Sequence, residues 1–120
     1  MKIAITSEGS TLDDRMDQRF GRAAKFIIFE TDDESFAVVD NEQNLNAAQG
    51  AGIQAAKHVV DSGSRALVTG HTGPKAFTVL NAAGIAVYLA PVGTVREAIA
   101  AWVAGSLNRI DRADVEGHWV

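Results

Sequence analysis

Alternating apolar and polar positions predict strands in the first third of the chain. Residues 2–7 alternate as a strand does, and residues 24–31 contain the run Phe26-Ile27-Ile28-Phe29, which is apolar on both faces like a covered central strand. A polar turn follows, and residues 36–40 form a third predicted strand. Because so short a turn joins the second and third strands, we expect them to pair as a hairpin.

The rest of the chain alternates helix and strand patterns. Helices are predicted over about 47–62, 74–83 and the stretch after Thr94, and strands over 65–69 and 85–89. Thr94 and Glu97 stand three residues apart before an apolar stripe, which is the pattern of a capping box. The order β-β-β-α-β-α-β-α predicts an α/β domain over residues 1–107, with one mixed five-stranded sheet flanked by helices. Residues 108–120 are mostly polar and are predicted to form a C-terminal tail.

The amino-acid composition and the net charge exclude several classes of function. The chain has 120 residues and no cysteine, which excludes disulfides, thiolate-held iron–sulfur clusters and cysteine nucleophiles. No apolar run is long enough for a membrane helix or a secretory signal, so a cytoplasmic protein without a membrane partner is expected. The net charge of −4 argues against a nucleic-acid partner. No helix shows an evident second apolar face, which leaves the oligomeric state open.

The charge is unevenly distributed along the chain. Four cations crowd one short segment, namely Arg15, Arg19, Arg22 and Lys25. Residues 31–56 contain no lysine or arginine. An acidic chain with this distribution can still contain a local basic site. The alternative is that these arginines are solvated or form salt bridges with the nearby acids Asp13, Asp14 and Asp17.

Two separated loops combine glycine with basic side chains. The first spans residues 17–22 and includes Arg19, Gly21 and Arg22. The second contains Gly70, His71, Thr72, Gly73 and Lys75, with Pro74 suited to the first turn of a helix. The second loop should follow a parallel strand, where open α/β sheets bind ligands and where the helix N-terminus favours anions. The alternative is an ordinary strand-to-helix turn; the loop lacks the Gly-Lys-Ser/Thr of a phosphate-binding P-loop.

A histidine in the second loop and a glycine-rich helix start are further candidates for ligand binding. His71 could donate a hydrogen bond to a sulfide or ligate copper through a neutral imidazole, or it could simply bond the backbone. Asn46, Gly50 and Gly52 form another glycine-rich helix entry. Because glycine lowers helix stability, its presence there points to a close approach of the backbone, either to a ligand or to the sheet.

A set of short motifs resembles a known family in order and spacing over nearly the whole chain. They are Asp17-x-Arg19-Phe20-Gly21-Arg22-Ala23, Asn46, Gly50-Ala51-Gly52-Ile53, Thr69-Gly70-x-x-Gly73-Pro74-Lys75-Ala76 and Ala83-Gly84-Ile85-x-Val87-Tyr88. The chain resembles the dinitrogenase iron–molybdenum cofactor biosynthesis family. The resemblance implies a ribonuclease-H-like fold and non-covalent carriage of a metal–sulfur cluster or its precursor.

Within that family, the chain is especially similar to a subgroup from sulfate-reducing bacteria. The implied cargo of that subgroup is an anionic molybdenum–copper sulfide cluster, or a related molybdenum–sulfur cluster. The implied partners are other proteins of a complex that includes ATPases and regulates cell division. The predicted cluster-binding residues are Arg19, Gly21, Arg22, Asn46, Gly50, Gly52, Gly70, His71, Thr72, Gly73 and Lys75, with His71 as the candidate metal ligand.

Two other functions remain as alternatives. Ribonuclease-H-type catalysis needs clustered carboxylates around Mg²⁺, one of them on the first strand, but residues 2–6 contain no acid and Glu8 comes only after them. No Ser-His-Asp spacing is evident either, so we expect a protein that is not an enzyme. The other alternative is a protein-interaction module in which metal binding is incidental.

Overall fold

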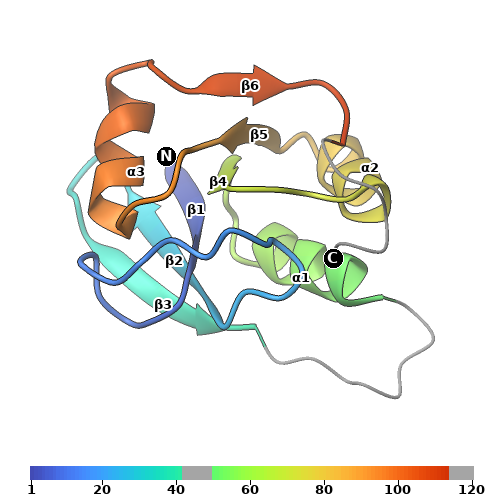
Figure 1. Cartoon of the computed structure of the whole chain (residues 1–120), viewed down its shortest axis with the longest axis horizontal. Coiled ribbons are helices and arrows are strands. Elements are labelled where there is room, and N and C mark those ends of the chain that lie inside the picture. The colour runs from blue at the N-terminus through green and yellow to red at the C-terminus, as the bar shows by residue number, and fades with distance from the viewer. Residues whose placement is uncertain (42–49, 114–120) are drawn as a thin grey trace.

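The computed structural model describes residues 1–41 and 50–113. Its strands are β1 (Lys2–Ser7), β2 (Lys25–Glu30), β3 (Phe36–Asp40), β4 (Ala66–Thr69), β5 (Ala86–Leu89) and β6 (Asn108–Ile110). Its helices are α1 (Ala51–Asp61), α2 (Pro74–Ala82) and α3 (Val95–Val103). No helix within these ranges is long and apolar enough to cross a membrane. All the strands belong to one sheet, in the order β3-β2-β1-β4-β5-β6 (Figure 1).

The sheet is mixed, as the sequence predicts. Its centre is parallel, because β4 pairs in parallel with both β1 and β5. On one side, β2 pairs antiparallel with β1 and with β3, which confirms the predicted hairpin. The register places Lys25 opposite both Ser7 and Asp40. The carboxyl ends of β1, β3, β4 and β5 therefore share one edge of the sheet with the start of β2.

Within the described residues the sheet has six strands, whereas the sequence predicts five. Residues Asn108–Ile110, predicted as the start of a polar tail, form β6 and pair antiparallel with β5. Ile110 lies opposite Val87 and packs, partly buried, against the core. An edge strand this short is held mainly by backbone hydrogen bonds, so its sequence carries little apolar signal. The ribonuclease-H-like label remains a prediction.

Each face of the sheet has its own hydrophobic core. On one face, α1 and α2 pack together over Ala4, Phe26 and Leu67. On the other face, α3 packs over β1 and β4. Figure 1 shows α3 well separated from the α1–α2 pair. The alternation of side chains along β1 explains this division, since Ala4 faces one core and Ile3 and Ile5 face the other.

The predicted capping box begins α3. The Thr94 hydroxyl accepts a hydrogen bond from the Glu97 N–H, and the Glu97 carboxylate accepts one from the Thr94 N–H at 2.8 Å. These hydrogen bonds from Thr94 hold the pKa of Glu97 below its usual value. Because the pKa of Glu97 is lower in the folded protein, its carboxylate contributes fully to folding stability above the usual glutamate pKa of about 4.3. This contribution is lost as the pH falls through the lower pKa of the folded state.

Replacing Thr94 with alanine should therefore destabilise the fold by about 1 kcal/mol at neutral pH, because the first turn of α3 loses its cap. Thermal or urea unfolding measures this change. Thr78→Ala is the matched control, since Thr78 is an exposed threonine inside α2 whose hydroxyl donates only to its own helix. An equal loss of stability in both variants would contradict the cap assignment.

Candidate functional site: two paired loops at the carboxyl edge of the sheet

The two glycine-containing loops predicted from the sequence lie at the same edge of the sheet. The loop of residues 17–22 leads into β2, and the loop of residues 70–73 leads from β4 into α2. Because β1 lies between β2 and β4, both loops are neighbours of its carboxyl end. This placement confirms the prediction that the second loop follows a parallel strand, the position at which open α/β sheets bind ligands.

The two loops are hydrogen-bonded to each other and to β1. The Phe20 N–H donates to the His71 carbonyl at 3.1 Å, and Arg19 aligns with His71 as in a short parallel pairing. Beneath them, the buried Thr6 hydroxyl donates to the Asp17 carbonyl at 2.7 Å and lies 3.0 Å from the Thr69 hydroxyl. Segments separated by some fifty residues in the chain thus form one continuous surface.

Gly70 is where the loops approach most closely. A Cβ atom added to Gly70 would lie 2.6 Å from the carbonyl oxygen of Gln18 and 2.8 Å from its Cα. The side-chain Oε1 of Gln18, at 2.5 Å, could rotate away, but the carbonyl oxygen and the Cα belong to the backbone, so side-chain rotation alone would not relieve the clash. The glycine is therefore required by the pairing of the loops, in addition to any role towards a ligand.

Alternating burial turns the cations of the first loop towards the surface. Phe20 is fully buried and packs against Phe26, with ring centroids 5.6 Å apart. Gly21 and Ala23 are also buried, whereas Arg19 and Arg22 are exposed. The aromatic side chain thus anchors the loop while both arginines remain at the surface.

A buried asparagine that the sequence analysis did not single out supports the same loop. The Asn41 side-chain amide donates to the Ala23 carbonyl at 2.8 Å and to the Gly21 carbonyl at 3.4 Å. Its Oδ1 lies 2.8 Å from Nδ1 of His58, which belongs to α1. Asn41 therefore connects the first loop to a helix. Its position directly after a predicted strand was the available signal.

In the described part of the chain, Arg19 and Arg22 do not form the salt bridges with Asp13, Asp14 or Asp17 that the sequence allowed. Asp13 forms its ion pair with Arg96 at 2.9 Å, and the Asp17 carboxylate accepts from the backbone N–H of Arg19 at 3.1 Å. Of the four crowded cations, Lys25 is paired with Asp40. Within residues 1–41 and 50–113, no ion pair involves Arg19, Arg22 or Lys75.

Two helices begin at a glycine, which has no side chain to cap their N-terminal N–H groups. Gly73 is the N-cap of α2 and Gly50 is the N-cap of α1, and among the described residues neither helix shows a side-chain cap at this position. In contrast, α3 is fully capped by its own residues. Uncapped N-terminal turns leave backbone donors and a partial positive charge available to an anion. Lys75, in the first turn of α2, adds a full positive charge.

The remaining predicted residues are placed as follows. His71 is half-buried, and Thr72 and Gly73 are buried. Gly52 is buried in the first turn of α1, next to the exposed Gly50. Asn46 and the predicted start of the first helix at residue 47 lie outside the described residues. Within residues 1–41 and 50–113, no three His, Asp or Glu side chains gather closely enough to hold a metal ion.

Comparison with known proteins identifies the family. Residues 1–105 match the family described as "Dinitrogenase iron-molybdenum cofactor". The fold is similar to that of the apo form of the orange protein from Desulfovibrio gigas, at 39% identity over 95% of this chain and 96% of that one, with a TM-score of 0.89. It is also similar to a NifB-type protein from Thermotoga, at 35% identity over 97% and 98% of the two chains, with a TM-score of 0.82.

A further relative comes from an archaeon. An uncharacterized protein of Methanocaldococcus jannaschii is 29% identical over 114 residues, which are 92% of each chain. The family match and the structural neighbours agree with the resemblance seen in the sequence, and together they indicate a role in binding or building a metal-containing cofactor. The chain belongs to the dinitrogenase iron–molybdenum cofactor family.

Proposed function

We propose that this protein binds and carries an anionic metal–sulfur cluster, without covalent attachment, on the paired loops at the carboxyl edge of its sheet. The observation that carries the proposal is the backbone pairing of Phe20 with His71. This pairing joins two loops whose arginines and lysine form no ion pair with the described residues. The cargo is a substrate that arrives and leaves, and the chain acts as a carrier rather than a catalyst.

The chemistry of such a cargo matches these groups. A thiomolybdate-type cluster is a bulky, soft polyanion, and Arg19, Arg22 and Lys75 can surround it with charge-assisted hydrogen bonds. The first turn of α2, whose glycine N-cap supplies no side-chain cap among the described residues, adds backbone N–H donors. Phe20 and Gly21 are buried directly beneath the arginines, which limits the access of water from below. His71 is the candidate side chain for a direct bond to copper.

The specific cargo we propose is a molybdenum–copper sulfide cluster. Support comes from the similarity to the orange protein and from the absence of cysteine, which leaves charge, hydrogen bonds and histidine as the means of holding a cluster. Protein isolated without oxygen from its native host should contain molybdenum and copper together and show strong sulfide-to-metal absorption. Iron with molybdenum and no copper would contradict the proposed metals while leaving the carrier function intact.

Lys75→Ala and Arg19→Ala should each weaken cluster binding by roughly 10- to 100-fold, since a hydrogen bond to a charged group contributes about 1.5–3 kcal/mol. The measurement is a visible titration of the metal-free protein with tetrathiomolybdate and Cu(I) under anaerobic conditions. The affinity should also fall with added salt.

Lys57→Ala is the matched control for this titration. Lys57 is an exposed lysine on α1, so its removal changes the net charge equally. The control variant should bind as the unmodified protein does. Equal losses in all three variants would refute the site, and a spectrum identical to that of a protein-free mixture would refute cluster binding.

A further inference from the structure

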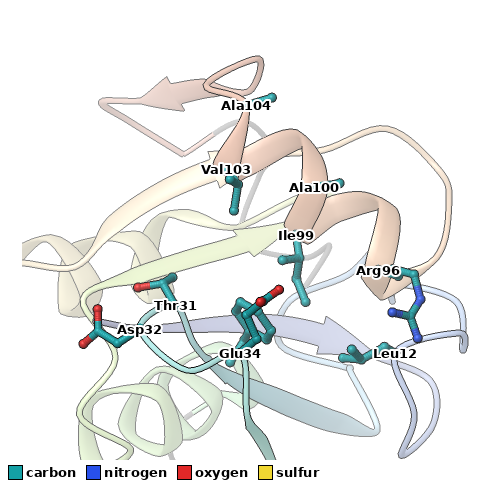
Figure 2. Close-up of a pocket in the computed structure, with 10 residues that line it drawn as sticks. Leu12, Thr31, Asp32, Glu34, Arg96, Ile99, Ala100, Val103 and Ala104 are labelled. Atoms are coloured by element: carbon teal, nitrogen blue, oxygen red, sulfur yellow. The ribbon is translucent and has the colours of Figure 1, made fainter.

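A concave surface lies on the face of the sheet that α3 covers, outside the paired loops. It is a groove of about 590 Å³ between α3 and the turn that joins β2 to β3 (Figure 2). Its floor is apolar and is formed by Leu12, Phe29 and Ile99. None of the residues that line the groove belongs to the cluster-binding loops.

One wall of the groove is an exposed apolar side of α3. Ala100, Val103 and Ala104 line it at the spacing of one helix face, and Val103 is 65% exposed. The side of α3 that faces the sheet buries Val95, Ala98 and Ile99. This helix therefore has two apolar sides, of which the described residues cover only one. Small residues along the uncovered side allow another backbone to approach closely.

The other wall is acidic. Thr31, Asp32 and Glu34 line it, and Figure 2 shows them across the groove from the residues of α3. Residues 30–34 contain four carboxylates. The N-terminal ammonium group pairs with two of them, Glu30 and Asp32, so the wall retains a negative charge. Arg96 lines the groove too, but its charge is balanced by the ion pair with Asp13.

We infer that this groove docks an amphipathic helix of a partner protein, with apolar side chains on the floor and basic side chains against Asp32 and Glu34. The lining of α3 runs from Arg96 to Ala104, about 12 Å at 1.5 Å per residue, so it accommodates about two turns of a partner helix. Such a helix would insert apolar residues at i, i+3 or i+4, and i+7. The acidic wall selects a basic helix over an acidic one.

The test is an NMR titration of the isotope-labelled full chain with a synthetic 18-residue helix that has a leucine face flanked by lysines. Chemical shifts should change at Leu12, Thr31, Ile99 and Val103 and remain unchanged at the paired loops. Val103→Glu should weaken binding at least 10-fold, because it places a charge on the apolar wall. It should leave cluster binding unaltered, since Val103 is exposed and lies at the end of α3, outside the paired loops.

Charge variants test the acidic wall separately. Asp32→Asn with Glu34→Gln should weaken binding of the lysine peptide several-fold and reduce its salt dependence. Asp61→Asn with Asp111→Asn removes the same charge from exposed positions outside the groove and should have little effect. Equal binding of a peptide with glutamates in place of lysines would overturn the inference. So would shifts confined to other surfaces, or self-association of the chain that Val103→Glu abolishes, which would make a second copy the occupant.

Discussion

Replacing Gly70 with alanine should both destabilise the protein and abolish most of its cluster binding. The added Cβ would lie 2.6 Å from the Gln18 carbonyl oxygen, so one of the two loops must move. Overpacking of this kind costs typically 1–3 kcal/mol, which corresponds to a fall in Tm of roughly 4–12 °C for a domain of this size. The affinity for the cluster should fall as well, even in molecules that remain folded. The reason is that movement of either loop changes the position of Arg19 relative to His71. Calorimetry and the anaerobic cluster titration measure the two effects.

Gly50→Ala is the control for this glycine. Gly50 is also a predicted site residue, but among the described residues no atom lies within 4 Å of where its Cβ would stand. Its φ of −72° is open to any residue, so alanine should fit there without a clash and cost less than about 1 kcal/mol, the preference of an N-cap for glycine over alanine. If both variants lost the same stability, the close approach at Gly70 would not be the cause.

Replacing Asn41 with alanine should have the second large effect. The variant removes the partner of three groups, the carbonyls of Gly21 and Ala23 and the ring nitrogen of His58. Leaving a buried polar group without its partner costs about 1–3 kcal/mol, so the total loss should reach at least about 2–3 kcal/mol. Because the loop that carries Arg22 loses its support, cluster affinity should fall as well, even though Asn41 lies beneath the surface.

The control is Asn81→Ala, which removes an exposed asparagine from α2 and should leave stability and binding nearly unchanged. Asn41→Ala would be uninformative about the site if it simply unfolded the chain. Circular dichroism at a temperature well below the midpoint checks this point. A folded Asn41 variant that binds the cluster as tightly as the unmodified protein would contradict the supporting role.

Much of the fold could be predicted because its signals are local. The apolar run of residues 26–29, the polar turn after it and the capping box at Thr94 each indicate their structure within a few positions. The strand Asn108–Ile110 was not predicted because it contains a single apolar residue. It is stabilised by backbone hydrogen bonds to the neighbouring strand, which leave no pattern in the sequence. The second apolar side of α3 was missed because alanines occur equally in cores and on surfaces.

The site was predictable in its parts but not in its assembly. Glycines and basic residues mark both loops, yet nothing local indicates that Phe20 would donate to His71, fifty residues away. From the sequence alone, Arg19 and Arg22 could as well form salt bridges with Asp13, Asp14 or Asp17. Only the fold shows that these aspartates have other partners. Asn41 begins an asparagine-rich polar stretch of the sequence, and its burial is a property of the folded chain that this stretch does not indicate.

The register of the β2–β3 hairpin has a further consequence for how a ligand reaches the protein. It places the four carboxylates of residues 30–34 at the amino edge of the sheet, opposite the edge that carries Arg19, Arg22 and Lys75. The acidic turn and the cations of the paired loops are therefore separated by the length of the strands. A diffusing polyanion that meets the acidic turn is repelled there, so this separation favours its approach from the edge of the paired loops, although the net charge is −4.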